Sequence, residues 1–426
     1  MSTPDPLPEL LRARRLDEAE ALCRARLQAD PADLDAAHFL LPHLARKGDA
    51  EQARALALRG VQASGGNRDL QLMLGQACEQ LGDLEAARAA YTAAAAADAD
   101  DWVAPLLLAD NLERLGEAAP ALTARVQALS RAERDGALQP QTPMPQVMQA
   151  RLQRAFLAVQ HARGLELDAA LAPFTAAARV RAATDALLGR RARTTSHPLQ
   201  QPTLLCLPDL PPQPWFDRAQ FPFLAAIEGE TEAIRAELLA LLDDDTGMEP
   251  YVDMPQRAPA ARLWQELNHS PRWRAFHFHR HGMPVAAHLA RCPRTAAALA
   301  ALPLMRIPGH APEAMFSLLA PRTRIPPHTG VINGRLTVHL PLVVPPRCGA
   351  LRAGEEARPW KEGQCLVFDD SFVHEAWNDS PHLRAVLIFD IWHPALTATE
   401  RQALSAVITA LGEFNRRHGA DDPLQE

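Results

Sequence analysis

Two histidines and one arginine in the C-terminal half have the types and spacing that an iron site with an anionic cosubstrate needs. His328 and His374 are 46 residues apart, and Arg384 follows ten residues later. Neutral imidazoles suit Fe(II), and a metal with few protein ligands keeps open positions for a bidentate 2-oxo acid and for dioxygen. A buried arginine needs an anion, which its planar guanidinium can bind through two parallel hydrogen bonds. The order of these residues therefore predicts a non-haem iron site beside a carboxylate-binding arginine.

The stretch HTGVINGRLTVHLPL, residues 328–342, lacks the carboxylate that commonly follows the first iron histidine. Gly330 stands where iron oxygenases usually have Asp or Glu. Because glycine offers no side chain to the metal, we expect water to take that position. Asp369 and Asp370 could be ligands in principle, but they lie at a strand-to-turn junction where aspartate is common, so we expect supporting or structural roles for them.

Alternating polar and apolar residues predict the strands that position these groups. In GRLTVHLPLVV, Arg335, Thr337 and His339 share one face, and leucines and valines occupy the other. In LRAVLIFDIW, Arg384 shares a face with Asp390, so an ion pair between these two is an alternative explanation of the arginine. Glycine, proline and aspartate turns separate several such runs, which favours a compact antiparallel β domain.

Three stretches strongly resemble the aspartyl/asparaginyl β-hydroxylase family, namely PHTGVINGRLTVHLPLVVP, WKEGQCLVFDDSFVHEAWND and LIFDIWHPALT. The resemblance covers residues 215–400 and is close over residues 315–397. The family's HTG and SFxHExW motifs correspond to His328, Thr329, Gly330, Ser371, Phe372, His374, Glu375 and Trp377.

The resemblance implies a double-stranded β-helix, a jelly-roll or cupin-like fold, that uses Fe(II), 2-oxoglutarate and O2. The family hydroxylates the β-carbon of aspartate or asparagine in proteins, and succinate and CO2 are released. Two histidines alone bind the iron in this family, which implies His328 and His374 as the metal ligands. By the same resemblance, Arg384 would pair with the C5 carboxylate of 2-oxoglutarate, while His339 and Ser317 would also contact this cosubstrate.

The chain departs from the animal members of the family at two positions. Thr337 stands where they have a second arginine that faces the cosubstrate, which leaves the grip on 2-oxoglutarate differently arranged. His279 corresponds to a tryptophan of theirs, and we expect it in the substrate cleft. Together with His277 and His281 it does not predict a metal site, because alternate residues of a strand lie about 6.5–7 Å apart.

Helical repeats are predicted in the N-terminal half. A glycine recurs every 34 residues in KGDAEQA, LGDLEAA and LGEAAPA, a period typical of tetratricopeptide helix-turn-helix repeats. Such repeats also commonly precede the oxygenase domain in the family that the chain resembles. The register comprises Gly48, Gly82 and Gly116 with Ala19, Ala53, Ala87 and Ala121, and an arginine replaces the first glycine.

We therefore expect a multidomain chain, since 426 residues exceed the size of a single core. An all-α tetratricopeptide-like solenoid would occupy residues 1–190, and a proline-rich linker residues 191–214, where closely spaced prolines exclude a helix. The oxygenase domain would occupy residues 215–426, with flanking helices at 221–244 and 397–417.

Composition narrows the partners. The net charge of -7 and the pI of about 6.2 argue against a nucleic-acid partner, which usually leaves a basic stripe on the protein. Six cysteines without CxxC spacing fit a reducing compartment. Because no signal peptide or long apolar segment is evident, we expect no membrane partner and a cytoplasmic location.

Two other classes of function stay open. The same chemistry could act on a lipid, a free amino acid or a small metabolite, or the chain could be a tetratricopeptide adaptor without activity. A solenoid favours a protein or peptide substrate that it recruits, although it could instead only stabilise the catalytic domain. Both iron histidines and Arg384 argue against the adaptor, whereas Thr337 argues slightly for it.

Overall fold

The computed structural model describes residues 5–139, 142–244, 247–254 and 261–420. This chain forms two compact units, one of residues up to 159 together with 417–420, and one of residues 160–416. The division falls inside a long helix, so it differs from the expected boundaries at residues 190 and 214. The proline-rich segment expected as a linker lies entirely within the second unit.

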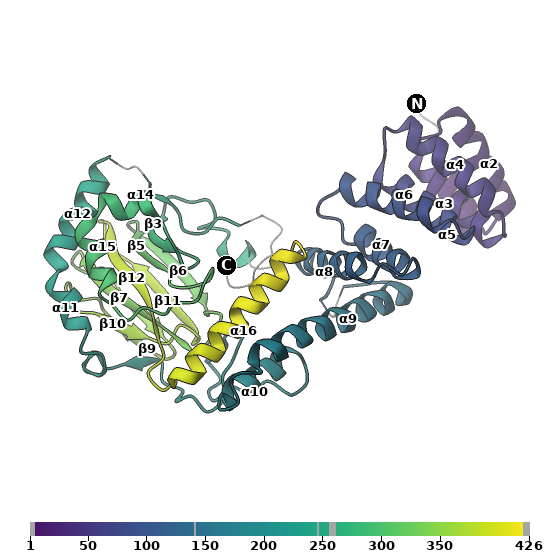
Figure 1. Cartoon of the computed structure of the whole chain (residues 1–426). Helices are drawn as coiled ribbons and strands as arrows, with labels where there is room; N and C mark the ends of the chain where they lie inside the picture. Colours follow the sequence, from purple (N-terminus) through teal and green to yellow (C-terminus); the bar gives the residue numbers. More distant parts are fainter. Residues whose placement is uncertain (1–4, 140–141, 245–246, 255–260, 421–426) are drawn as a thin grey trace. The chain divides into compact units, whose positions relative to one another are not determined.

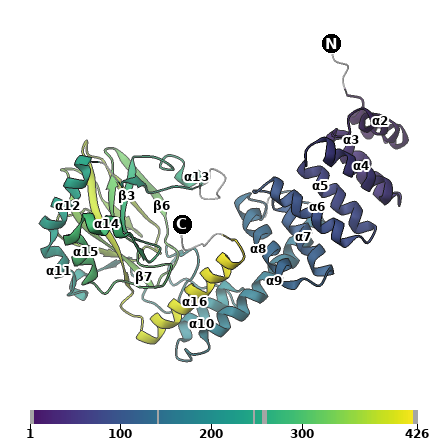
Figure 2. The ribbon, with the colours of Figure 1, turned by 45° about the horizontal axis from the view of Figure 1, so that its top comes forward.

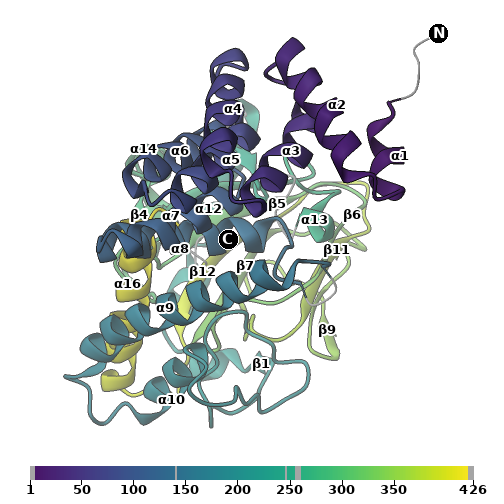
Figure 3. The same ribbon diagram turned by 90° about the vertical axis from the view of Figure 1, so that its right-hand side faces the viewer.

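The first unit consists of helices in which, among the first eight, each packs against the next along the chain, and residues of the eighth and ninth share an apolar cluster. Figures 1 and 3 show these helices at the purple and blue end of the colour scale. They are α1 (Leu7–Arg12), α2 (Leu16–Ala29), α3 (Leu34–Arg46), α4 (Ala50–Ala63), α5 (Arg68–Gln80), α6 (Leu84–Ala97), α7 (Val103–Arg114), α8 (Ala118–Arg134) and the first part of α9 (Gln146–Leu171).

The predicted repeat register is confirmed in its turns. Gly48, Gly82 and Gly116 each follow a helix and have φ angles of 85°, 78° and 80°, in the left-handed region that favours glycine. Arg14, one period before Gly48, adopts the same conformation with φ 55°. The alanines of the register are all buried where neighbouring helices meet: Ala19, Ala53, Ala87 and Ala121.

The second unit is built on two antiparallel sheets with flanking helices. The larger sheet has the order β1-β10-β7-β12-β5-β3-β2, with β4 paired to β3, and the smaller has the order β6-β11-β8-β9. The strands of the two sheets are β1 (Trp215–Phe216), β2 (Glu249–Pro250), β3 (Trp273–Arg280), β4 (Met283–Pro284), β5 (Ala314–Leu319), β6 (Thr323–His328), β7 (Arg335–Val343), β8 (Leu351–Ala353), β9 (Glu356–Arg358), β10 (Leu366–Phe368), β11 (His374–Asn378) and β12 (Arg384–Trp392). Its helices are α10 (Ala178–Leu187), the short 3-10 helix η1 (Arg218–Gln220), α11 (Leu224–Gly229), α12 (Thr231–Asp244), α13 (Ala261–Trp264), α14 (Ala286–Arg291), α15 (Pro293–Ala300) and α16 (Ala398–Arg417).

The larger sheet has an apolar face under helices and a polar face towards the smaller sheet. Leu336, Val338 and Leu340 pack with α11, α12 and α15, which lie on one side of the sheet in Figures 1 and 2. Thr337 and His339 lie on the opposite face, as the alternation in the sequence predicts. A separate core between the two sheets includes Trp215, Trp273, Ile325, Leu351, Trp360, Phe368 and Val386. The site residues are therefore held between two packed cores.

The closing helix α16 covers another part of this unit. It packs beside α10, as Figures 1 and 3 show, and shares a core with residues of the proline-rich segment. Thr397 and Glu400 exchange hydrogen bonds at its start, so Thr397 caps the helix. The single helix expected at 221–244 is instead two, because α11 ends at Gly229 and α12 begins at Thr231. Within the described ranges, no helix is long and apolar enough to cross a lipid bilayer.

Candidate active site

The two predicted iron histidines lie side by side on the smaller sheet. His328 ends β6 and His374 begins β11, and these residues are paired in the register, with ring centroids 4.0 Å apart. Each Nδ1 lies close to a backbone carbonyl oxygen, that of Pro326 at 2.8 Å and that of Phe372 at 2.9 Å. Because a carbonyl only accepts, each Nδ1 carries the proton and leaves the Nε2 lone pair free for a metal.

Both imidazoles are neutral near pH 7. Burial lowers the pKa of His328 to about 3, with a further contribution from His374, and burial lowers the pKa of His374 to about 4. Two neutral imidazoles with free Nε2 atoms are a suitable donor pair for Fe(II). Among the described residues, no group of three His, Cys, Asp or Glu side chains is placed to hold a metal ion. The protein part of an iron site here would therefore be this pair.

Asp370, from the turn before His374, lies close to Gly330, the position where iron oxygenases usually have a carboxylate. A Cβ at Gly330 would overlap the carboxylate of Asp370 and would lie only 2.7 Å from its Oδ1. Asp370 also pairs through Oδ2 with Arg335, and its buried Oδ1 has no hydrogen-bond partner in the described part of the chain. Gly330 is therefore required by close packing against Asp370, which the sequence-based interpretation of an open position did not include.

Arg384 is a buried cation without an anionic partner among the described residues. Its side chain is 1% exposed, and it donates one hydrogen bond of 3.3 Å to the carbonyl of Ser317. Its guanidinium lies over the ring of Trp360, 4.7 Å from the centroid, while Nε has no hydrogen-bond partner among the described residues. Burial lowers the pKa of Arg384 to about 10, so the charge is poorly compensated.

The alternative ion pair between Arg384 and Asp390 is wrong. Asp390 instead lies 3.7 Å from Arg335 and accepts a 3.0 Å hydrogen bond from the backbone N–H of Glu313. No described carboxylate lies within 4.0 Å of Arg384. The guanidinium is therefore placed to receive an external carboxylate, such as the far end of a 2-oxo acid.

Ser317 and His339 lie beside Arg384 and are each oriented by a tryptophan. The Ser317 hydroxyl accepts a hydrogen bond of 3.0 Å from Trp273 Nε1, so its own hydrogen is free to be donated. His339 Nδ1 accepts from Trp360 Nε1 at 3.4 Å, which leaves a proton on Nε2 of the neutral ring. Burial, with the nearby charge of Arg384, lowers the pKa of His339 well below its usual value. Both side chains can thus donate to an anionic ligand.

The tryptophans of this site were not found from the sequence. Trp273 begins β3 and Trp360 lies between the two sheets, and each contacts a predicted cosubstrate residue. A third ring, Trp264, packs edge-on against His328 at 4.9 Å. The one available signal was that tryptophan is rare here, with seven residues in a chain that is 5% aromatic.

His279 is not brought into this group of residues. A register shift between His277 and His279 pairs His279 with Ala314, which belongs to the core under the helices. At this irregularity the neighbouring Phe278 packs into the core under the helices, and His279 is half-buried. His277 and His281 lie near Glu313, at 3.7 and 3.4 Å, as members of a polar cluster.

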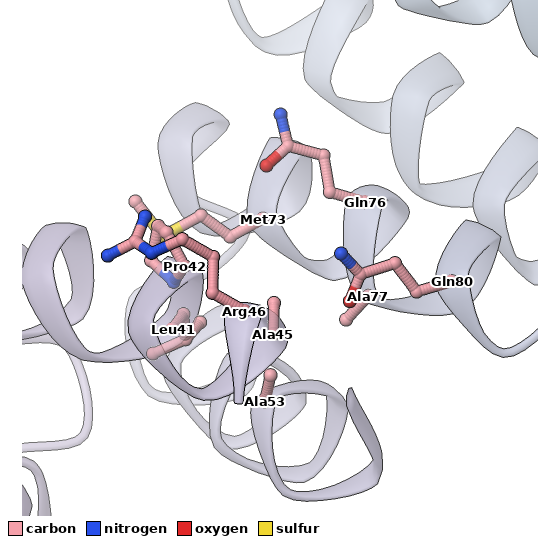
Figure 4. Close-up of a pocket in the computed structure, with 9 residues that line it drawn as sticks. All are labelled: Leu41, Pro42, Ala45, Arg46, Ala53, Met73, Gln76, Ala77 and Gln80. Atoms are coloured by element: carbon pink, nitrogen blue, oxygen red, sulfur yellow. The ribbon is translucent and has the colours of Figure 1, made fainter. Parts of the chain in front are cut away.

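A separate hollow is found in the helical unit. Side chains from α3, α4 and α5 line a half-open hollow of about 180 Å³. Figure 4 shows Arg46, Gln76 and Gln80 around it, together with small apolar side chains. Its lining offers amide and guanidinium groups but no histidine or carboxylate, so this hollow could bind a side chain and has no groups for iron chemistry.

Comparison with known proteins finds hydroxylases similar to this chain. Residues 228–394 match the profile of the family described as Aspartyl/Asparaginyl beta-hydroxylase. The chain is 46% identical over 92 residues to the mouse (Mus musculus) Aspartyl/asparaginyl beta-hydroxylase, which is 22% of this chain and 12% of that protein. It is 34% identical over 183 residues to the Ornithine lipid ester-linked acyl 2-hydroxylase of Rhizobium tropici, or 42% of this chain and 61% of that one.

A third relative matches over more of the present chain. The human (Homo sapiens) Aspartate beta-hydroxylase domain-containing protein 2 is 35% identical over 217 residues, which is 49% of this chain and 55% of that protein. The chain thus spans less than two thirds of each of these three relatives. The residues that match the family profile lie in the second unit, and the relatives support a hydroxylase.

Proposed function

Because residues 228–394 match the profile of the aspartyl/asparaginyl β-hydroxylase family, we propose that the chain is an Fe(II)- and 2-oxoglutarate-dependent dioxygenase. Its substrate would be a side chain of a protein or peptide, hydroxylated most readily at the β-carbon of aspartate or asparagine. O2 would be consumed, and succinate and CO2 released. The observation that carries the proposal is Arg384, a buried cation without a described carboxylate partner, joined through Trp360 to His339.

The residues present fit these groups. His328 and His374 would hold the iron through Nε2, because their Nδ1 protons are engaged by backbone carbonyls. Arg384 would bind the far carboxylate of 2-oxoglutarate, and Ser317 and His339 would donate further hydrogen bonds to it. When bound, iron and 2-oxoglutarate supply the activation of dioxygen for insertion into a C–H bond.

The remaining side chains exclude water and fix orientation. The Trp264 ring against His328 and the core between the sheets give the site a dry wall. Burial keeps both iron histidines unprotonated before metal arrives, so no proton has to leave them when a metal binds. The protein's contribution is thus positioning and shielding of the reacting groups.

The negative charge of Asp370 next to the iron pair favours a substrate without a free negative charge. Arg335 is ion-paired to Asp370 and lies 3.7 Å from Asp390, and Thr337 supplies no further cation. An aspartate substrate would bring a third carboxylate to one arginine, whereas an asparagine amide would not. We therefore propose asparagine over aspartate, to be checked by succinate release with peptides that differ only in Asn or Asp. A preference for the aspartate peptide would contradict this order.

The same carboxylates favour one second candidate, a substrate that carries an amine. Glu313 lies close to Asp390, since its backbone N–H donates to that carboxylate, and adds a further negative group. The Rhizobium tropici relative is described as a hydroxylase of an ornithine lipid. Hydroxylation of an amine-bearing lipid, free amino acid or metabolite is therefore the alternative within the same chemistry.

We also propose the finer architecture that this function would use. Strands β5, β7, β10 and β12 lie in the larger sheet, and β6, β8, β9 and β11 in the smaller, which supports a double-stranded β-helix of the jelly-roll type. The 34-residue register with its turn glycines supports tetratricopeptide-like repeats. The repeat unit would recruit a protein or peptide substrate, for which the hollow in Figure 4 could accept one side chain. Six free, buried cysteines support a reducing, cytoplasmic location.

The proposal is tested by adding Fe(II) and 2-oxoglutarate to the metal-free protein under anaerobic conditions. We expect the metal-to-ligand charge-transfer absorption of the complex, followed by succinate when oxygen is admitted. His374→Ala should lose both signals, whereas His382→Ala, which removes an exposed histidine, should keep them. Absence of both signals in the wild-type protein would refute the dioxygenase and leave the adaptor.

A further inference from the structure

The proline-rich segment that precedes β1 runs in an extended path along the turn that presents His374. The backbone N–H of Gln201 donates to the carbonyl of Ser371 at 2.8 Å, and the N–H of Val373 donates to the carbonyl of Leu199 at 2.8 Å. These bonds form a short antiparallel bridge between Gln200 and Phe372. Prolines on either side prevent a helix there, and the extended chain pairs with the turn instead.

The same segment then crosses to the turn that follows His328. The N–H of Thr203 donates to the carbonyl of Gly330 at 3.1 Å, and the N–H of Leu204 donates to that of Val331 at 2.9 Å. A few residues on, the Asn333 side chain accepts from the N–H of Leu207 at 2.7 Å and donates to its carbonyl at 2.9 Å. Residues 199–207, called the strap below, therefore bond to both histidine turns.

One strap side chain enters the His374 turn. Gln200 is 1% exposed, and its Nε2 donates to Asp369 Oδ2 at 3.0 Å and to Ser371 Oγ at 3.3 Å. The other oxygen of Asp369 accepts from the backbone N–H of Ser371 at 2.9 Å. The next residue, Phe372, supplies the carbonyl that accepts from His374 Nδ1. Gln200 thus contacts Ser371, which directly precedes Phe372, and the carbonyl of Phe372 orients the His374 ring.

We infer that Gln200 is a positioning residue for the iron site, and that the strap fixes the two histidine turns relative to each other. The inference rests on the proposed function for the metal, but the contacts involve only this chain's own residues. The turns are also joined directly, since the N–H of Gly330 donates to the carbonyl of Asp370 at 2.7 Å. The strap adds a bond to each turn from outside, so it limits independent movement of the two imidazoles.

The test compares Gln200→Leu with the wild-type chain, and uses Gln220→Leu, at an exposed position, as the matched control. Groups that orient metal ligands commonly contribute 10- to 100-fold in metal affinity, so we expect Fe(II) binding by Gln200→Leu to weaken by about ten-fold or more. The KM for 2-oxoglutarate should stay unchanged, because Arg384 and Ser317 lie on the other sheet. In the metal-free protein, the amide of Val373 should exchange hydrogen faster in the variant.

Each outcome decides one question. If the wild-type chain shows no charge-transfer absorption with iron and 2-oxoglutarate, the proposed function fails, and hydrogen exchange in metal-free protein still tests the strap. If the wild-type complex forms and Gln200→Leu matches it in iron affinity and exchange, the positioning role is refuted. A parallel loss of iron affinity and rise in the KM for 2-oxoglutarate would also refute it, as general loosening. Should Gln200→Leu not fold, Gln200→Asn, which is too short to reach Asp369, replaces it under the same criteria.

Discussion

Restoring the usual carboxylate beside the first iron histidine should damage the site. In Gly330→Asp, the new Cβ would overlap the carboxylate of Asp370, and a second negative charge would be added next to it. Asp370 would have to move away from Arg335, with which it is ion-paired. We therefore expect weaker iron binding and less succinate, although the variant has the residue found in most iron oxygenases.

The size of the effect follows from two contributions. Forcing one extra carbon into packed surroundings costs about 1–3 kcal/mol, and this part should appear alone in Gly330→Ala. Two carboxylates about 4 Å apart repel by about 4 kcal/mol at an effective dielectric constant of about 20, and this part is specific to Gly330→Asp. The difference between the two variants should thus approach a thousand-fold in an equilibrium constant, less whatever Asp370 relieves by turning.

Anaerobic Fe(II) titration and urea unfolding of the metal-free protein measure the two parts. Gly330→Ala should lose stability and some iron affinity, and Gly330→Asp should lose more of both. The double variant Gly330→Asp/Asp370→Gly moves the carboxylate from one turn to the other and removes the overlap. Its iron affinity should exceed that of Gly330→Asp alone, because overlap and repulsion are both relieved.

The reasoning is refuted by a gain of function. If Gly330→Asp binds iron as tightly as the wild-type chain and releases succinate faster, the space beside Gly330 is open to a ligand and its packing against Asp370 is unimportant. Equal, wild-type behaviour of the alanine and aspartate variants would also contradict it.

Two further predictions concern the cosubstrate and pH. Arg384→Met should raise the KM for 2-oxoglutarate by at least about 30-fold, because removing one partner of a buried charge pair costs about 2–5 kcal/mol, whereas iron affinity should stay unchanged. Steady-state assays with varied 2-oxoglutarate measure this KM. An unaltered KM would show that Arg384 does not bind the carboxylate of 2-oxoglutarate. The metal-free protein should lose stability as the pH falls from about 6.5 towards 4, since the pKa of buried His374 is about 4 and the unfolded chain binds the proton first. His374→Asn should lose about 1.4 kcal/mol less per pH unit in that window, as measured by urea unfolding at several pH values, and an identical slope would count against a buried, neutral His374.

Much of the catalytic half could be predicted because its signals are local. Strand alternation separates His339 from its apolar neighbours, and the motifs place His328 and His374 at strand ends, as the register shows. The position of His279 in a substrate cleft stays a prediction, and the register shift within β3 that pairs this residue with Ala314 could not be predicted. A shift of this kind leaves no reliable mark in sequence periodicity.

The contacts that depend on tertiary packing could not be predicted. The close approach of Asp370 to Gly330 arises from two turns 40 residues apart in the chain. Gln200 lies in a segment whose prolines exclude a helix but do not indicate which strand or turn will pair with it. The contacts of buried tryptophans such as Trp360 could not be predicted either, because a single aromatic residue in a sequence does not indicate which side chain it contacts.

The place of the strap in the chain bears on which fragment could act alone. A fragment that begins at Trp215, where the motif-bearing region starts, would keep every residue proposed to touch iron or 2-oxoglutarate. It would nevertheless expose the carbonyls of Gly330 and Ser371 to water and remove the hydrogen bond from the Gln200 side chain to Asp369. The smallest fragment that folds and acts alone should therefore begin before residue 197, and so include most of the proline-rich segment that the sequence predicts as a linker.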